Sequence, residues 1–78
     1  MSKYVYILQS DTTGGYYCGQ TQDIEDRFHR HNSGQSKYTR HGVPWRLVRV
    51  IECDDRSSAL RLEQKIKKRG IERYLSES

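Results

Sequence analysis

Large side chains alternate between two faces near the start of the chain, over residues 4–9. One face carries Tyr4, Tyr6 and Leu8, and the other carries Val5 and Ile7. This period of two is typical of a β-strand. A second strand is expected over residues 16–21, because the polar run before it ends in two glycines and is a turn signal.

Two tyrosines, Tyr6 and Tyr17, fall on these adjacent strands. Placing them opposite one another leaves a four-residue loop at residues 10–13, which is an acceptable hairpin length. Directly opposed residues share a face of the sheet. This register, one of several that the sequence allows, would therefore place both phenols on the same side.

The first helix is predicted to begin after Asp23 and to run to about Asn32. Asp23 is a suitable N-cap, and Asp26 three residues later favours the positive end of a helix. Ser33 and Gly34 then give a stop signal.

The rest of the chain is predicted as loop, strand and helix. Residues 33–44 are polar and basic and should form a loop with a helical turn, whereas residues 45–53 are rich in Val, Leu and Ile and should form a strand. Asp54 or Asp55 then caps a last helix that ends at Gly70. Residues 71–78 are expected to fray.

This order of elements favours a small α/β or α+β sandwich, in which helices flank a mostly antiparallel three-stranded sheet. Seventy-eight residues make one domain, residues 1–78. A chain of this length buries only about 60% of its unfolded surface, so its core is small.

Six of the eight aromatic residues are tyrosine, which favours a polar working surface. For Tyr16, Tyr38 and Tyr74 we expect ordinary packing with the hydroxyl at the rim.

The net charge of +4 is unevenly placed along the chain. Residues 1–39 hold four basic and four acidic side chains, whereas residues 40–78 hold ten basic and six acidic ones. Such an excess suits a face that meets a polyanion, and it equally suits a solvated basic helix.

Cysteine usage and hydropathy indicate a cytoplasmic chain that makes no membrane contact. No apolar run is long enough to span a bilayer, and no secretory signal is recognisable. Cys18 and Cys53 fall in expected strands and are interpreted as small, reduced core residues. A zinc site that combines them with His31 or His41 is not favoured, because no paired metal-binding spacing is present.

Glu63 is the main candidate metal ligand. Its position in the helical period puts it at the edge of the buried face, where a carboxylate needs a partner. A hard cation such as Mg²⁺ would satisfy it. A salt bridge to Arg61, Lys65 or Lys67 would do the same, and periodicity alone favours the salt bridge.

Arg27 and His31 are four residues apart and share one helix face. A guanidinium offers a fixed fork of donors that matches a phosphate, and an imidazole exchanges a proton near neutral pH. The alternative is that Arg27 pairs with Asp23 and that His31 packs at the helix end.

Taken in order, Tyr4-Val5-Tyr6, Tyr17-Cys18-Gly19, Arg27-x-x-x-His31 and a helical Glu63 resemble the GIY-YIG nuclease family. The triplets depart from Gly-Ile-Tyr and Tyr-Ile-Gly but keep both tyrosines and the second glycine. The resemblance covers nearly the whole chain, and residues 36–40 and 44–48 look like those of the small bacterial stand-alone members. It implies the same architecture and an endonuclease that hydrolyses DNA.

The resemblance also implies roles for these residues. Tyr6 would help to activate a water, with His31 accepting the proton, and cationic Arg27 and a metal ion nearby would lower the pKa of the phenol. Tyr17 and Arg27 would orient and stabilise the phosphate, and Gly19 would let the backbone pass close to the first helix. Glu63 would hold one Mg²⁺ or Mn²⁺, since a single candidate carboxylate fits a one-metal reaction.

The DNA is expected to be held through its phosphate backbone, which gives affinity without sequence reading. The candidate contacts are Lys37, Tyr38, Thr39, Arg40, Arg61, Lys65, Lys67 and Lys68, with Arg69 and Arg73 beyond them. The late polar residue of many family members has no match after Gly70. Target choice would then come from DNA structure, in repair or recombination, or from a protein partner. A non-catalytic nucleic-acid-binding module and a protein-interaction domain stay open as alternatives.

Overall fold

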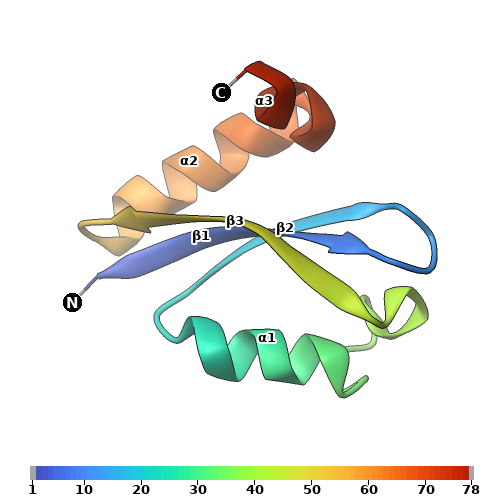
Figure 1. Ribbon diagram of the computed structural model, residues 1–78. Helices are drawn as coiled ribbons and strands as arrows, with labels where there is room; N and C mark the ends of the chain where they lie inside the picture. The colour runs from blue at the N-terminus through green and yellow to red at the C-terminus, as the bar shows by residue number, and fades with distance from the viewer. Residues whose placement is uncertain (1, 78) are drawn as a thin grey trace.

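The computed structural model describes residues 2–77, which fold into one antiparallel sheet with helices on both of its faces (Figure 1). In chain order the elements are β1 (Lys3–Ser10), β2 (Tyr16–Thr21), α1 (Ile24–Asn32), the 3₁₀ turn η1 (Arg40–Gly42), β3 (Trp45–Cys53), α2 (Arg56–Arg69) and α3 (Ile71–Glu77). In Figure 1, α1 lies below the sheet and α2 and α3 lie above it. The predicted α+β sandwich is confirmed.

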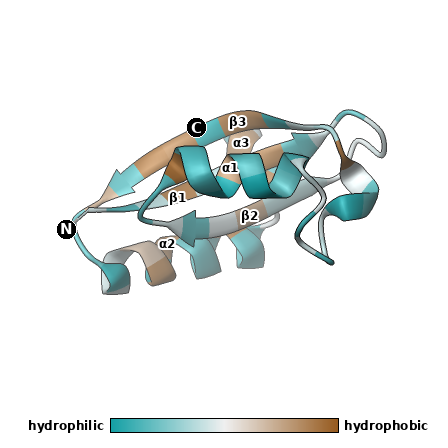
Figure 2. Ribbon diagram, turned by 90° about the horizontal axis from the view of Figure 1, so that it is seen from below, coloured by the Kyte–Doolittle hydropathy of each residue, from teal (hydrophilic) through white to brown (hydrophobic). Residues whose placement is uncertain are grey.

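The first strand is the centre of the sheet. The strand order is β2-β1-β3, and β1 pairs antiparallel with both neighbours. Figure 2 shows α1 over one face of the sheet and α2 beyond the other, with hydrophobic residues gathered on the strands. Successive side chains of β1 therefore point toward the α1 layer and the α2 layer in turn.

The predicted alternation along β1 separates two packed clusters. On the α2 side, Val5 and Ile7 are fully buried together with residues of β2, β3 and α2: Cys18, Cys53, Ala59 and Ile66. On the α1 side, Tyr6 and Leu8 pack with Trp45 and, more loosely, with Tyr17, Ile24, Phe28 and Val43. Cys18 and Cys53 are free, buried core residues, as predicted.

The register of the first hairpin differs from the expected one. Tyr6 pairs with Gly19, and Tyr17 pairs with Leu8. The hairpin closes one residue later, where the Ser10 N–H donates to the Gly15 carbonyl at 2.8 Å. Within the turn, the Ser10 hydroxyl accepts hydrogen bonds from the backbone N–H groups of residues 12 and 13, and Gly14 adopts a φ of 77°. The shift is two residues, an even number, so both phenols still lie on the same face of the sheet.

Both predicted helix caps are present. The Asp23 carboxylate accepts from the Asp26 N–H at 3.0 Å. Of the two candidates for the second cap, the structure selects Asp55, which accepts from the Ser58 N–H at 2.8 Å. The expected helical turn in the loop is η1.

The frayed end expected over residues 71–78 is wrong for the residues that are described, and Ser78 lies outside them. Gly70, with φ 97°, ends α2, and the chain then forms α3. Ile71, Tyr74 and Leu75 pack against the α2-side cluster. Their spacing of three and four residues gives this short helix an apolar face to bury.

The expected packing of tyrosines holds for two of three. Tyr16 and Tyr74 are half-buried against the α2-side cluster. Tyr38 is 92% exposed, so its predicted packing role is wrong. Within residues 2–77, no helix is both long and apolar enough to cross a membrane.

The α2-side cluster should carry much of the stability of so small a domain. Ile66 is fully buried, whereas Leu60 on the same helix is 43% exposed. We expect Ile66→Ala to lower the free energy of unfolding by about 2–5 kcal/mol because it leaves a cavity. The matched control Leu60→Ala should cost about 0.5 kcal/mol or less. Urea unfolding followed by circular dichroism measures both, and equal losses would contradict this account of the core.

Candidate active site

The phenol of Tyr6 meets the imidazole of His31 in the interior of the α1 side. Tyr6 lies mid-way along β1 and is 2% exposed, and His31 lies near the end of α1 and is 3% exposed. The Tyr6 Oη and His31 Nε2 atoms are 3.0 Å apart. The two residues are 25 positions apart in sequence, so the fold itself creates this contact.

The other ring nitrogen of His31 has its own partner. Nδ1 lies 2.8 Å from Thr39 Oγ1, and Thr39 is 1% exposed. One tautomer satisfies both bonds with a protonated phenol: Nδ1–H donates to Thr39, and Nε2 accepts from Tyr6. Burial, together with the nearby charge of Arg27, lowers the pKa of His31, so the ring is a neutral base at pH 7.

Thr39 therefore has a different position from the predicted one. We expected it to contact the sugar-phosphate backbone, but its side chain is buried against His31 and its carbonyl accepts from Trp45 Nε1 at 2.7 Å. A lone threonine in a polar loop carries no sequence signal for this role. Only the tertiary structure brings it to the imidazole.

The phenol of Tyr6 is held in its protonated form. Burial is the largest effect and, together with neighbouring Tyr17, raises the pKa of Tyr6 well above its usual range. Arg27 lowers the same pKa, as we expected, but by less than burial raises it. Arg27 alone therefore does not give the net lowering expected of Arg27 together with a metal ion, because removing a phenolate from water costs more than one nearby cation returns.

Tyr17 and Arg27 complete a group of four around His31. The ring centroid of Tyr17 lies 4.9 Å from that of His31 and 6.2 Å from that of Tyr6. Arg27 is one helical turn before His31 and lies close enough to influence the pKa values of both Tyr6 and His31. Its Nε–H is buried without a hydrogen-bond partner among the described residues.

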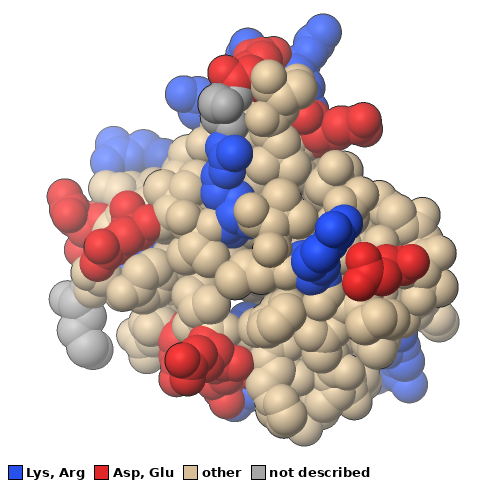
Figure 3. Space-filling model, in the orientation of Figure 1, with Lys and Arg blue, Asp and Glu red and all other residues tan. Residues whose placement is uncertain are grey.

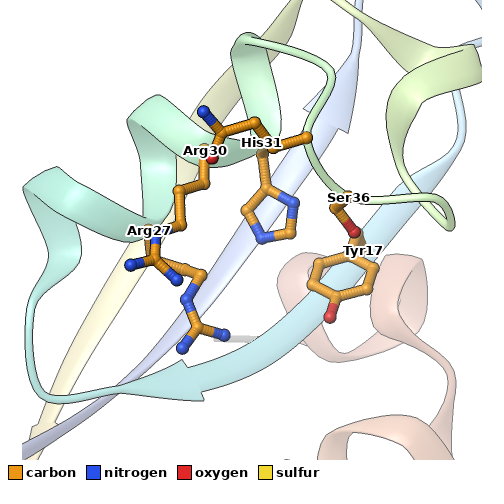
Figure 4. Close-up of a pocket in the computed structure, with 6 residues that line it drawn as sticks. Tyr17, Arg27, Arg30, His31 and Ser36 are labelled. Carbon is orange, nitrogen blue, oxygen red and sulfur yellow. The ribbon is translucent and has the colours of Figure 1, made fainter.

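A cavity of about 300 Å³ opens beside these side chains. Figure 4 shows the Arg27 guanidinium, the His31 imidazole and the Tyr17 ring gathered between α1 and β2. The lining residues are Tyr17, Arg27, Arg30, His31, Gln35 and Ser36. Of the two guanidinium groups, that of Arg30 pairs with Asp26 at 3.0 Å. With two cations in its lining, this cavity suits an anion.

Glu63 stands apart from this group, on the helix that covers the other face of the sheet. Its side chain is 15% exposed, and its carboxylate accepts from Lys67 Nζ at 2.7 Å, so the salt bridge considered from the sequence is formed. Burial raises the pKa of Cys18 to about 11, and the Glu63 charge adds to that rise. Glu63 therefore lies near Cys18, and Cys18 directly follows Tyr17 on the edge strand β2.

Glu63 offers a single carboxylate, which is the kind of ligand that a hard cation of the Mg²⁺ type takes. Mg²⁺ is commonly held by one or two carboxylates and completed by waters and substrate phosphates. Within residues 2–77, no group of three or more His, Cys, Asp or Glu gathers into a metal site. The zinc alternative therefore has no support, whereas a single carboxylate remains compatible with one Mg²⁺ or Mn²⁺.

The predicted DNA contacts divide between two surfaces. Lys37, Tyr38 and Arg40 are exposed on the loop that follows α1, close to the cavity. The candidate contacts on α2 are also exposed, but they lie on the side of the sheet away from α1: Arg61, Lys65, Lys67 and Lys68. On the face drawn in Figure 3, Lys and Arg lie apart from one another and alternate with Asp and Glu.

Gly19 has a different purpose from the expected one. A Cβ atom at this position would lie 2.8 Å from Tyr6 Oη and 3.1 Å from Tyr17 Cε2. The residue therefore makes room for the two phenols rather than for the first helix.

A family model described as the GIY-YIG catalytic domain matches residues 2–74. The chain belongs to the GIY-YIG family. Its relatives include a UPF0213 protein of Syntrophus aciditrophicus, 47% identical over 72 residues, which span 87% of this chain and 80% of that protein. The UPF0213 protein BH0048 of Halalkalibacterium halodurans is 40% identical over 68 residues, 86% of this chain and 71% of that protein.

A solved structure shares the fold. The solution NMR structure of the UPF0213 protein BH0048 from Bacillus halodurans superposes with a TM-score of 0.61 at 38% identity, over 97% of this chain and 84% of that one. The GIY-YIG architecture deduced above is therefore also that of an experimentally determined relative.

The lowered pKa of His31 links stability to pH. Below about pH 6.5 the unfolded imidazole gains a proton while the folded one resists it, so stability present above pH 6.5 is lost as pH falls. We expect the free energy of unfolding, measured in urea at pH 7.5 and 5.0, to fall less in His31→Gln than in wild type. His29→Gln, an exposed control on the same helix, should fall as wild type does. An equal fall in His31→Gln would contradict the buried neutral ring.

The close approach at Gly19 can also be tested. Gly19→Ala should push the Tyr6 ring away from His31 and lower stability by about 1–3 kcal/mol, as overpacking does. The His31 pKa, followed by NMR, should change with it. Gly15→Ala is the control, because its Cβ would meet only the exposed Thr13 hydroxyl, at 3.3 Å. Unchanged stability and an unchanged His31 pKa in Gly19→Ala would show that the phenols have room to spare.

Proposed function

We propose that this protein is an endonuclease that hydrolyses phosphodiester bonds in DNA with the help of one divalent metal ion. One observation carries the proposal. The Tyr6–His31 hydrogen bond lies beside a buried Arg27 Nε–H that has no partner among the described residues, at a cationic cavity. Membership of the GIY-YIG catalytic domain family supports it.

The cavity provides the place for the phosphate. A buried donor without a partner is costly, and a phosphate oxygen would satisfy the Arg27 Nε–H with a charge-assisted hydrogen bond. Arg30 adds a second positive charge to the lining, and the Tyr17 side chain lines the same space. As negative charge develops on the phosphoryl oxygens, these fixed donors stabilise it.

The Tyr6–His31 pair provides the route for the proton. Tyr6 is a protonated phenol, so it does not itself act as a resident base. As a water attacks phosphorus, its proton passes to the Tyr6 oxygen while the phenol proton passes to His31 Nε2. The hydroxyl of Thr39 then stabilises the imidazolium through Nδ1–H. A new P–O bond forms to the water oxygen, the bond to the leaving oxygen breaks, and that oxygen takes a proton from solvent.

Glu63 is the residue that would hold the ion, either Mg²⁺ or Mn²⁺. When bound near the edge strand β2, where Glu63 lies close to Cys18 and where Tyr17 lines the cavity, such an ion would neutralise charge on the phosphate and on the leaving oxygen. Lys67 has to release the Glu63 carboxylate for this to happen, because it occupies that carboxylate at 2.7 Å.

The partner is DNA, held mainly through phosphates. Lys37 and Arg40 beside the cavity, with the basic residues of α2, would supply the salt-dependent contacts. We further propose a cytoplasmic protein that acts on DNA structure in repair or recombination, with target choice shared with a protein partner.

The test is cleavage of labelled duplex, single-stranded, flap and branched DNA in Mg²⁺ or Mn²⁺ and then in EDTA. Glu63→Gln, His31→Gln and Tyr6→Phe should each lower the rate at least about 100-fold, as expected when general acid–base or charge stabilisation is lost. Glu52→Gln, an exposed carboxylate on β3, should cut as wild type does.

Cutting that persists in EDTA or in Glu63→Gln would refute the assignment of the metal. Salt-sensitive binding without cutting by any variant would favour a non-catalytic nucleic-acid-binding module instead.

A further inference from the structure

The most exposed large apolar side chain near the cavity is that of Tyr38. It is 92% exposed, so its ring contributes almost nothing to the folded core. A ring presented this fully is free to contact a binding partner, and tyrosine combines a large apolar face with a polar end.

The turn that carries Tyr38 is nevertheless well anchored. The backbone N–H groups of Thr39 and Arg40 both donate to the Ser36 carbonyl, at 3.3 and 3.0 Å. The next side chain along, that of Thr39, is buried and bonded to His31. Tyr38 is therefore displayed from a fixed turn, one residue away from the group that positions the catalytic imidazole.

The same turn borders the phosphate cavity. Ser36 lines the cavity, and two residues of chain reach at most about 7 Å, so Tyr38 begins close to its rim. Lys37 and Arg40 on either side are exposed, and residues 33–43 contain no Asp or Glu. A polyanion drawn to this rim would bring its bases within reach of the ring.

An exposed aromatic ring in a cationic setting matches an unpaired nucleobase. Bases stack on aromatic side chains whatever their sequence, whereas the bases of an intact duplex are already stacked on one another. We propose that Tyr38 stacks on an unpaired base next to the phosphate held in the cavity. The preferred substrate is then DNA with an unpaired nucleotide at the cleavage point. This inference rests on the proposed function and adds its substrate class.

The test is a binding measurement in EDTA, so that cleavage does not enter. A 12-nucleotide single strand containing one 2-aminopurine, and the same strand in a duplex, are titrated with protein while the fluorescence of 2-aminopurine is followed. Wild type should bind the single strand more tightly and change its fluorescence. Tyr38→Ala should bind the single strand about 5- to 150-fold more weakly, the equivalent of about 1–3 kcal/mol per stacked base, and leave duplex binding unchanged.

Two variants control the measurement. Tyr38→Phe keeps the ring and should bind as wild type does. Leu60→Ala removes an exposed apolar side chain from α2, beyond the other face of the sheet, and should also bind normally. Loss of affinity in Tyr38→Phe would mean that the hydroxyl, not the ring, makes the contact, and would overturn stacking.

The outcomes separate the two proposals. If Tyr38→Ala binds both DNAs as wild type does, the stacking role is refuted while DNA binding stands, and the exposed ring belongs to some other contact, such as one with a protein. If wild type binds neither DNA, the proposed function itself fails.

Discussion

The whole site depends on β1 lying between two covered layers. Because side chains alternate across a strand, the central position of β1 sends Val5 and Ile7 into the α2-side cluster and Tyr6 into the α1 side. A slip of one residue would exchange the two sets and remove the phenol from its imidazole. The alternation of side chains along β1 thus determines both the packing of the core and the position of the Tyr6 hydroxyl.

That constraint also fixes the electrostatics. Burial keeps Tyr6 protonated and His31 neutral, since each charged form would lose its water. Arg27 opposes burial at the phenol but reinforces it at the imidazole, because a cation stabilises a phenolate and destabilises an imidazolium. The result is a neutral donor–acceptor pair beside a permanent positive charge, an arrangement ready to move a proton while an anion is held.

Local sequence rules predict most of the secondary structure, whereas they do not predict the contacts between distant residues at the site. The strands and the helix caps follow from short-range patterns. The predicted hairpin register was wrong by two residues, but an even shift keeps both phenols on one face of the sheet. The net pKa direction of Tyr6, the burial of Thr39 and the exposure of Tyr38 depend on which surfaces meet in three dimensions. Helix α3 was not predicted because it is short, and its apolar side chains stabilise it only by packing against the α2-side cluster.

The Glu63–Lys67 pair has a consequence for how the domain exists before it works. A half-buried carboxylate that already has a cation beside it does not need a metal ion to be tolerated by the fold. The domain should therefore fold without a bound metal ion, unlike small domains that fold only when they bind metal. Under the proposed one-metal reaction, the supply of metal would then change the activity of the protein and not the fraction of it that is folded.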